Sequence, residues 1–358
     1  MKKIVFNILI TIILVSVWVS CIPHTHDSVV TCDITYDKEY VIRWDVYPSA
    51  QGYVNVYIST SPDSFDLEGT PVAVVPASDG VVEVPSPNTL NRYYFYLNFN
   101  DCFGRVVGAR APYIQSAYSF RDLGGYSCLG NKKSKWGMIY RAGVLDTLSQ
   151  RDKQRVKNLN VKTIIEYRDK EECMYSPSEL GVENIIYMQP SDFDVDSLIS
   201  KVHHGEFKRG DARVSMQDFY LSLLTEESKD SFIKLFDILA DKENYPIIMT
   251  SRYGKGFNDM ASLFILSALG VSIDEIYEDY TWANQYFCKT RIIEKVSHLP
   301  QDVREAIASI VHNNRKDLLA IVNTIQHKYG SIDKYMIEEL KLTKDKREKI
   351  QKNLLVVE

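Results

Sequence analysis

The sequence has few cysteines, glycines and prolines for its length, and it has no excess of basic charge. Six cysteines among 358 residues are too few for the disulfide framework of a small secreted scaffold. The 17 glycines and 12 prolines exclude a collagen-like or low-complexity chain, and 45% hydrophobic residues can form a packed core. Acidic residues outnumber lysine and arginine by 47 to 42, so we expect no nucleic-acid partner. The length predicts two domains.

Long hydrophobic runs are also scarce, and the first twenty residues contain the main one. Lys2 and Lys3 precede a mostly apolar run from Ile4 to Val19, which is shorter than the roughly 20 residues that span a bilayer. A positive start followed by a short apolar stretch predicts a signal peptide over residues 1–20. An uncleaved membrane anchor is the alternative.

The residues around Cys21 suggest how the mature chain begins. Val19-Ser20-Cys21 resembles the end of a bacterial lipobox, with Trp18 at the position where leucine is usual. The resemblance implies a lipid on Cys21, with residues 21–30 as a tether. We therefore expect a lipid-anchored protein of the bacterial cell envelope that faces the periplasm or lies on the cell surface.

Residues 31–112 show the pattern of a small all-β domain. Apolar and polar residues alternate over residues 40–46 and again over 54–58 and 93–99, with turn signals between them. This predicts a sandwich of about seven strands, in which Trp44 and the tyrosine-rich late strand resemble an immunoglobulin or fibronectin type III module. Such a domain would bind a protein partner or act as a spacer. Cys32 and Cys102 could form a disulfide or remain two core thiols.

Strand and helix signals alternate after residue 117. Ser149 is a helix N-cap with Asp152 as the other half of a capping box. Short apolar strands are predicted at 161–166 and 246–249, and a helical pattern extends over 216–239. The alternation predicts a central sheet flanked by helices.

Several ordered motifs in residues 117–358 resemble those of the bacterial atypical tyrosine phosphatases. Phe120–Tyr126 reads FRDLGGY, residues 136–143 match that family's WG-x-x-YRSG segment, and residues 163–168 match its TVIDLR strand. The downstream segments 268–271, 278–280 and 329–331 follow in the expected order. The resemblance implies the cysteine-phosphatase fold, and it marks four family-motif residues: Arg121, Asp122, Arg141 and Arg168. Of these, Arg121 and Asp122 could keep structural roles as an ion pair that holds a loop.

The catalytic loop of that family reads H-C-x-x-G-K-D-R-T-G, and this chain departs from it at 250–259. In the family, the cysteine attacks phosphorus, backbone N–H groups hold the phosphoryl oxygens and the arginine binds two of them. Here Ser251 replaces the nucleophilic cysteine, Gly256 the aspartate and Phe257 the arginine, while Asp259 replaces the closing glycine. Candidate ligand-binding residues are those of the loop itself: Ser251, Arg252, Tyr253, Gly254, Lys255 and Gly256.

These replacements remove the parts on which cysteine-phosphatase chemistry depends. A serine hydroxyl needs an adjacent base, and no histidine or carboxylate flanks Ser251 in the sequence. The lost arginine removes a bidentate clamp for a phosphoryl group. We therefore predict an envelope pseudophosphatase that binds a phosphorylated protein, a small anionic phosphoester or a protein partner without turnover. The alternative is an active protein-tyrosine, dual-specificity or phosphoinositide phosphatase with a rearranged site. We expect neither a metal nor a cofactor.

Overall fold

The computed structural model describes residues 27–100, 103–188, 195–206, 208–286 and 297–357. The predicted signal peptide, Cys21 and Cys102 lie outside the described residues, so the lipid site and the Cys32–Cys102 pairing stay predictions. Within the described ranges, no helix is both long enough and apolar enough to cross a membrane.

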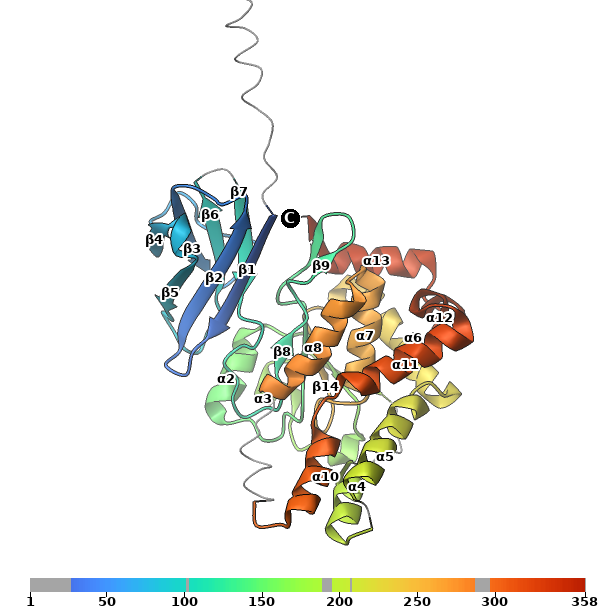
Figure 1. Cartoon of the computed structure of the whole chain (residues 1–358). Helices are drawn as coiled ribbons and strands as arrows, with labels where there is room; N and C mark the ends of the chain where they lie inside the picture. Colours follow the sequence, from blue (N-terminus) through green and yellow to red (C-terminus); the bar gives the residue numbers. More distant parts are fainter. Residues whose placement is uncertain (1–26, 101–102, 189–194, 207, 287–296, 358) are drawn as a thin grey trace, which may run out of the picture.

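The first part of the chain forms two antiparallel sheets around one apolar core, and we call residues 27–109 the β-module (Figure 1). Its first strand begins at Asp27, inside the tether predicted for 21–30. The predicted alternation is confirmed in the second half of β2, where Trp44 and Val46 are buried between exposed neighbours, whereas Val41 is buried beside Ile42. The sheet orders are β1-β2-β5 and β4-β3-β6-β7, built from β1 (Asp27–Ile34), β2 (Glu39–Tyr47), β3 (Tyr53–Ser59), β4 (Ala73–Pro76), β5 (Val81–Pro85), β6 (Tyr94–Phe99) and β7 (Phe103–Gly108).

The second part of the chain, which we call the α/β domain, is built on a five-stranded sheet. Four of its strands are parallel, and β8 joins β11 antiparallel at one edge. Parallel strands buried on both faces are continuously apolar, as in the predicted strand at 246–249. The order is β13-β12-β14-β11-β8, with β8 (Arg121–Asp122), β11 (Ile139–Ala142), β12 (Thr163–Glu166), β13 (Asn184–Tyr187) and β14 (Ile247–Thr250).

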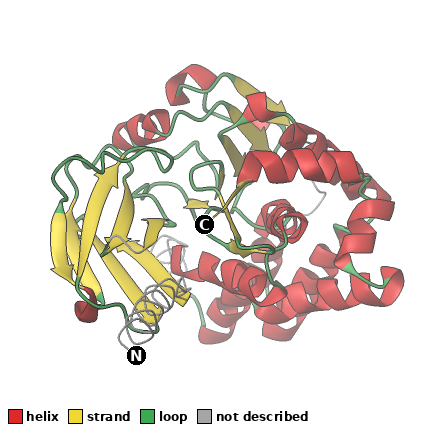
Figure 2. Cartoon of the chain, turned by 90° about the horizontal axis from the view of Figure 1, so that it is seen from above, coloured by secondary structure: helices red, strands yellow, loops and turns green. Residues whose placement is uncertain are grey.

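Helices cover both faces of this sheet (Figure 2). Within β14, Ile248 faces one apolar cluster, whereas Ile247 and Met249 face the other. The first cluster is covered by α2 (Gln150–Asn158) and α3 (Pro177–Leu180). The larger cluster is covered by α4 (Val195–His203), α5 (Arg209–Ser222), α6 (Glu226–Ala240), α7 (Phe257–Leu269), α8 (Ile273–Tyr286), α10 (Gln301–Val311), α11 (Arg315–Tyr329), α12 (Ile332–Glu338) and α13 (Lys344–Leu354).

A short sheet brings the end of the chain back to the start of the α/β domain. It has the order β15-β10-β9 and contains β9 (Ser127–Cys128), β10 (Lys132–Ser134) and β15 (Leu355–Val357). Short 3₁₀ turns lie at 77–79, 170–172 and 242–244. The predicted helix cap is confirmed in part, because the Ser149 side chain accepts from the Asp152 N–H. The Asp152 carboxylate, however, accepts from Ser116 instead of closing a capping box.

Arg92 joins the β-module to the α/β domain. Its guanidinium donates to the Asp122 carboxylate at 2.6 Å and to the Tyr140 hydroxyl at 3.0 Å. Both charged side chains are almost completely buried, with 4% of Arg92 and none of Asp122 exposed. Trp136 of the α/β domain also packs against the apolar core of the β-module. The two parts therefore share a buried ion pair and a common apolar contact.

We predict that Arg92→Ala lowers the free energy of unfolding by about 3–5 kcal/mol, because it leaves the Asp122 carboxylate buried without its cation. Chemical denaturation followed by circular dichroism measures this change. Arg43→Ala is the matched control, since Arg43 pairs with Asp33 at an exposed position and should cost at most about 1 kcal/mol. Equal effects of the two substitutions would contradict the assigned role of Arg92.

Candidate functional site

The candidate site is the loop 251–256, which joins the end of β14 to the start of α7. In an open α/β sheet, ligands bind beyond the carboxyl ends of the parallel strands, and this loop lies there. Two glycines allow the loop to adopt its backbone conformation. Gly254 has φ +69°, and a Cβ atom there would lie 3.0 Å from the Gly143 nitrogen. Gly256 has φ +62°, and its Cβ would lie 2.6 Å from the Phe219 ring.

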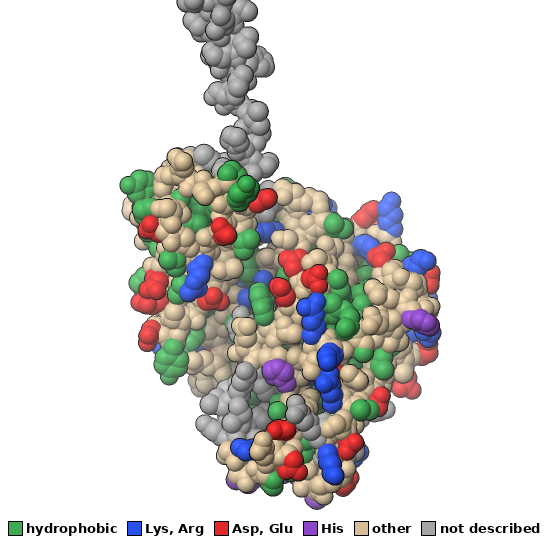
Figure 3. Space-filling view, viewed as in Figure 1, with side chains coloured by type: hydrophobic (Ala, Val, Ile, Leu, Met, Phe, Trp, Pro, Cys, Tyr) green, Lys and Arg blue, Asp and Glu red, His purple; other side chains and the backbone are tan. Residues whose placement is uncertain are grey.

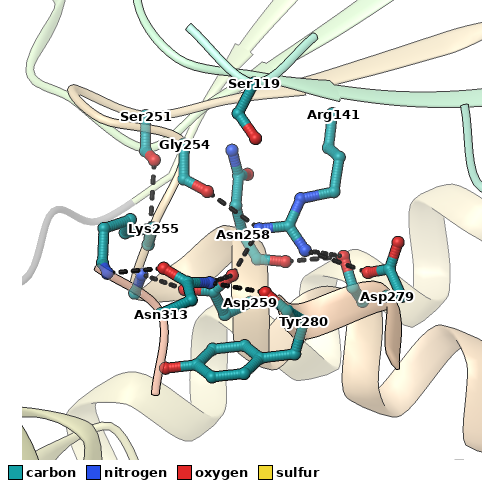
Figure 4. Close-up of polar contacts among 12 residues, drawn as sticks. Ser119, Arg141, Ser251, Gly254, Lys255, Asn258, Asp259, Asp279, Tyr280 and Asn313 are labelled. Carbon is teal, nitrogen blue, oxygen red and sulfur yellow. Dashed lines mark hydrogen bonds and ion pairs between the residues drawn. The ribbon is translucent and has the colours of Figure 1, made fainter. Parts of the chain in front are cut away.

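Ser251 stands at the position of the family's nucleophile, and its hydroxyl faces the loop's own backbone. The Oγ atom donates to the Lys255 carbonyl oxygen at 3.2 Å, as Figure 4 shows. The residue is buried, with 8% of its surface exposed. Among the described residues, neither a histidine nor a carboxylate contacts this hydroxyl. The site therefore lacks the adjacent base that a serine nucleophile requires.

Phe257 stands at the position of the family's arginine, and its ring is part of the core. It stacks on Tyr167 with 5.1 Å between ring centroids and 12° between the planes. Phe232 of α6 approaches from another side at 5.3 Å. With 4% of its surface exposed, Phe257 presents no group to a phosphoryl ligand. The clamp position has become an apolar contact between α7, α6 and the end of β12.

Lys255 keeps the family's lysine, but its ammonium group points into the protein. The Nζ atom donates to the Asn313 side-chain oxygen at 2.5 Å and to the Val311 carbonyl at 3.3 Å. Burial disfavours the charged form and lowers the pKa of Lys255 to about 8, although Asp259 and Asp317 partly offset the effect. The lysine is therefore still mostly protonated near neutral pH.

Asp259 replaces the family's closing glycine and lies in the first turn of α7. Its carboxylate accepts from the Gly256 N–H at 3.1 Å and from the Tyr220 hydroxyl at 2.7 Å. Arg141 donates to the same carboxylate at 2.5 Å. A negative charge at a helix N-terminus is stabilised by the helix dipole. The N–H of Gly256 thus has a partner within the protein.

Arg141 and Asp279 form the centre of a buried ionic network (Figure 4). Beyond Asp259, the Arg141 guanidinium donates to the Gly254 carbonyl, the Ser262 hydroxyl and, at 3.5 Å, the Asp279 carboxylate. Burial would raise the pKa of Asp279, but the two guanidinium groups of Arg121 and Arg141 hold it well below its usual range. The network ties the loop, α7 and α8 to strand β11.

The other family-motif residues also make buried contacts within the protein. Arg121 donates through Nε and Nη2 to the Asp279 carboxylate, and it is completely buried. Asp122 accepts from Arg92 and from two backbone N–H groups, those of Gly124 and Gly137. These contacts give the motif a structural role.

Arg168 and Arg252 are both held in ion pairs by carboxylates of the α/β domain. Arg168 is bound by Glu166 and Asp146, with distances of 2.6 to 3.0 Å. Arg252 donates to Glu172 at 2.9 Å in an exposed ion pair, so it does not take the place of the missing clamp. The Tyr253 ring lies beside Tyr118, with 6.4 Å between centroids. The structure thus brings Ser251, Gly254, Lys255 and Gly256 together and directs Arg252 away from them.

Three residues of the site were not identified from the sequence: Tyr220, Asp279 and Asn313. Asp279 belongs to the segment 278–280, which matches the family in order, so the sequence contained a pattern that could have identified it as a site residue. Tyr220 lies in a helix with apolar spacing, which predicted only a core position. Asn313 lies between α10 and α11, 58 residues after Lys255, and no sequence pattern marks it.

Comparison with known proteins agrees with this architecture. The sequence model described as "Tyrosine phosphatase family" matches residues 112–356. A protein of Cupriavidus necator, named "Putative tyrosine-protein phosphatase", is 23% identical over 236 residues, which cover 62% of this chain and 81% of that protein. The chain belongs to the tyrosine phosphatase family.

We predict that Phe257→Ala lowers the free energy of unfolding by about 3–5 kcal/mol, because it leaves a cavity beside Tyr167 and Phe232. Phe257→Arg, which restores the family residue, should cost at least as much because it buries an unpaired charge. Chemical denaturation of both variants tests this. Phe65→Ala in the β-module is the control, because Phe65 is only partly buried and should cost less. A stable, fully folded Phe257→Arg protein would contradict the prediction.

Proposed function

We propose that this chain is a pseudophosphatase, which keeps the tyrosine-phosphatase fold and does not turn over phosphoesters. The observation that carries the proposal is that the side chains at the predicted nucleophile and arginine positions both make contacts within the protein. Ser251 bonds to a carbonyl, and Phe257 stacks in the core. Membership of the family indicates the fold, whereas hydrolysis of phosphoesters depends on the residues of the catalytic loop.

The energetic argument rests on the transition state. Phosphoryl transfer depends on positioned donors that stabilise charge on the equatorial oxygens. Removing a single such donor costs roughly 100- to 1,000-fold in rate in other enzymes. Here Phe257 stands at the predicted position of the arginine clamp, the Lys255 ammonium is held inside the protein and the Gly256 N–H donates to Asp259. Its nucleophile position carries a hydroxyl without a base. All of these losses reduce the stabilisation of one transition state, that of phosphoryl transfer.

A loop that does not turn over its ligand would serve as a binding surface. We infer that it receives a phosphorylated protein or a small anionic phosphoester, and that the β-module adds a contact for a protein partner. On the face seen in Figure 3, Lys, Arg, Asp and Glu side chains are interspersed without a single-sign field. Such a surface suits one specific contact better than general attraction to polyanions.

We predict that the full chain hydrolyses p-nitrophenyl phosphate no faster than its Ser251→Ala variant. Restoring the thiol alone in Ser251→Cys should leave the rate at that level, since the clamp and the acid are still missing. Absorbance of released nitrophenolate gives the rate, and vanadate serves as the control ligand. Turnover that is lost in Ser251→Ala and inhibited competitively by vanadate would establish an active phosphatase with a rearranged site.

We also propose that the chain is an envelope lipoprotein attached through a lipid on Cys21. The support is the order of charge, apolar run and small residue before that cysteine. Fatty-acid chains of this kind add about 0.8 kcal/mol of membrane affinity per buried CH₂ group.

We predict that radiolabelled palmitate is incorporated into the full-length protein expressed in a bacterium, and that Cys21→Ala abolishes the label. Fractionation should then show the wild type with the membranes and the variant no longer lipid-bound. Cys128→Ala is the control and should keep the label, because Cys128 lies in the folded α/β domain. Label that persists in Cys21→Ala would contradict the assignment.

A further inference from the structure

Lys255 is a buried cation whose two hydrogen bonds go to neutral acceptors, although the Asp259 and Asp317 carboxylates partly offset its burial without forming an ion pair with it. Its Nζ atom donates to the Asn313 amide oxygen and to the Val311 carbonyl, and within the described ranges no carboxylate forms an ion pair with it. The side chain is attached to the loop 251–256, where an anion would bind. Burying an ammonium group without a paired charge is costly, so a site that offers a negative charge would compete for it.

Several hydrogen bonds hold Asn313 in place, so the position of its side-chain oxygen, which accepts from Lys255, is well defined. Its side-chain N–H groups donate to the Tyr280 carbonyl at 3.0 Å and to the Asp259 carboxylate at 3.4 Å. Its backbone N–H donates to the Asn284 side chain at 2.7 Å, and its carbonyl accepts from the same side chain at 2.9 Å. These contacts orient the amide so that its oxygen faces Lys255 (Figure 4).

We propose that Asn313 is a positioning residue that holds the Lys255 ammonium inside the protein and thereby limits anion binding by the loop 251–256. This inference rests on the proposed function, since it specifies how the binding loop of a pseudophosphatase is regulated. In this proposal, breaking the contact between Lys255 and Asn313 releases the lysine side chain to turn toward the loop. The loop then gains one cation for a phosphate group.

The contact also couples the loop to the region where α10 meets α11. Asn284 near the end of α8 holds the backbone of Asn313, so a shift of this corner relative to α8 would move the amide oxygen that binds Lys255. A change at the helical side of the domain would thus alter anion affinity at the loop. Such coupling needs two arrangements that the ligand distinguishes, and the inward and outward positions of Lys255 supply them.

Two substitutions at Asn313 should have opposite effects. Asn313→Ala removes the acceptor, and we expect inorganic phosphate to bind at least about tenfold more tightly by titration calorimetry, as one added charge-assisted hydrogen bond would give. Asn313→Asp adds a carboxylate that pairs with Lys255, and phosphate binding should weaken or disappear. In Asn313→Ala/Lys255→Met, the gain should be absent. Phosphate binding unchanged in Asn313→Ala, or a gain that survives Lys255→Met, would overturn the proposal.

Chemical labelling gives a second measurement that needs no ligand. Acetic anhydride followed by peptide mass spectrometry reports the reactivity of each lysine. We expect Lys255 to react faster in Asn313→Ala than in wild type and more slowly in Asn313→Asp. Lys344, which is 91% exposed, sets the fast reference, and Lys229, which is buried beside Glu226 and Glu339, reports global unfolding. Equal Lys255 labelling in the two Asn313 variants would overturn the proposal.

The controls separate this inference from the proposed function. Asn353→Ala loses a side-chain amide that donates to the Leu239 and Ala240 carbonyls far from the loop, so it should bind phosphate and label as wild type does. Hydrolysis of p-nitrophenyl phosphate is measured on the same samples. Turnover with the predicted binding pattern would refute the pseudophosphatase and keep the role of Asn313. If there is no turnover, and phosphate binding and Lys255 labelling are unchanged in the Asn313 variants, the role of Asn313 is refuted and the pseudophosphatase proposal is kept.

Discussion

The arrangement of the α/β domain depends on the buried guanidinium of Arg141. It extends from β11 and contacts the loop carbonyl of Gly254, the carboxylate of Asp259 on α7 and that of Asp279 on α8. Because the guanidinium is planar and permanently charged, it can hold several acceptors in fixed directions. Without it, the Asp259 carboxylate would be left buried without an ion-pair partner and Asp279 would keep only Arg121. Arg141 therefore acts together with backbone contacts such as Ser251 N–H to Ala142 in placing the loop on the sheet.

The side chains at the start of α7 are also held by contacts within the protein. Asp259 supplies a negative charge at the start of α7, and Phe257 fills the space between Tyr167 and Phe232. On the proposed function, these intramolecular contacts take the place of contacts with a phosphoryl group. Lys255 is then the residue whose ammonium group could exchange its protein partner for a ligand.

Much of the fold could be predicted because it depends on local patterns. Alternation gave β2, continuous apolar runs gave β12 and β14, and Ser149 marked the start of α2. The helical pattern over 216–239 was predicted as one stretch, but the chain breaks it into α5 and α6 near Thr225. The site was predictable only where a motif marked it. The contacts of Asn313 and Arg92 join residues 30 to 58 positions apart, and only the tertiary structure brings them together.

The buried pair of Arg92 and Asp122 has a consequence for how the molecule is presented to its surroundings. Because the β-module is joined to the α/β domain through this pair and through Trp136, a tether attached before Asp27 acts on the whole protein as on one body. A membrane attachment at that point would hold the loop 251–256 at the membrane together with the β-module and the α/β domain. Partners would then approach the loop from a restricted range of directions, so geometry as well as chemistry would select them.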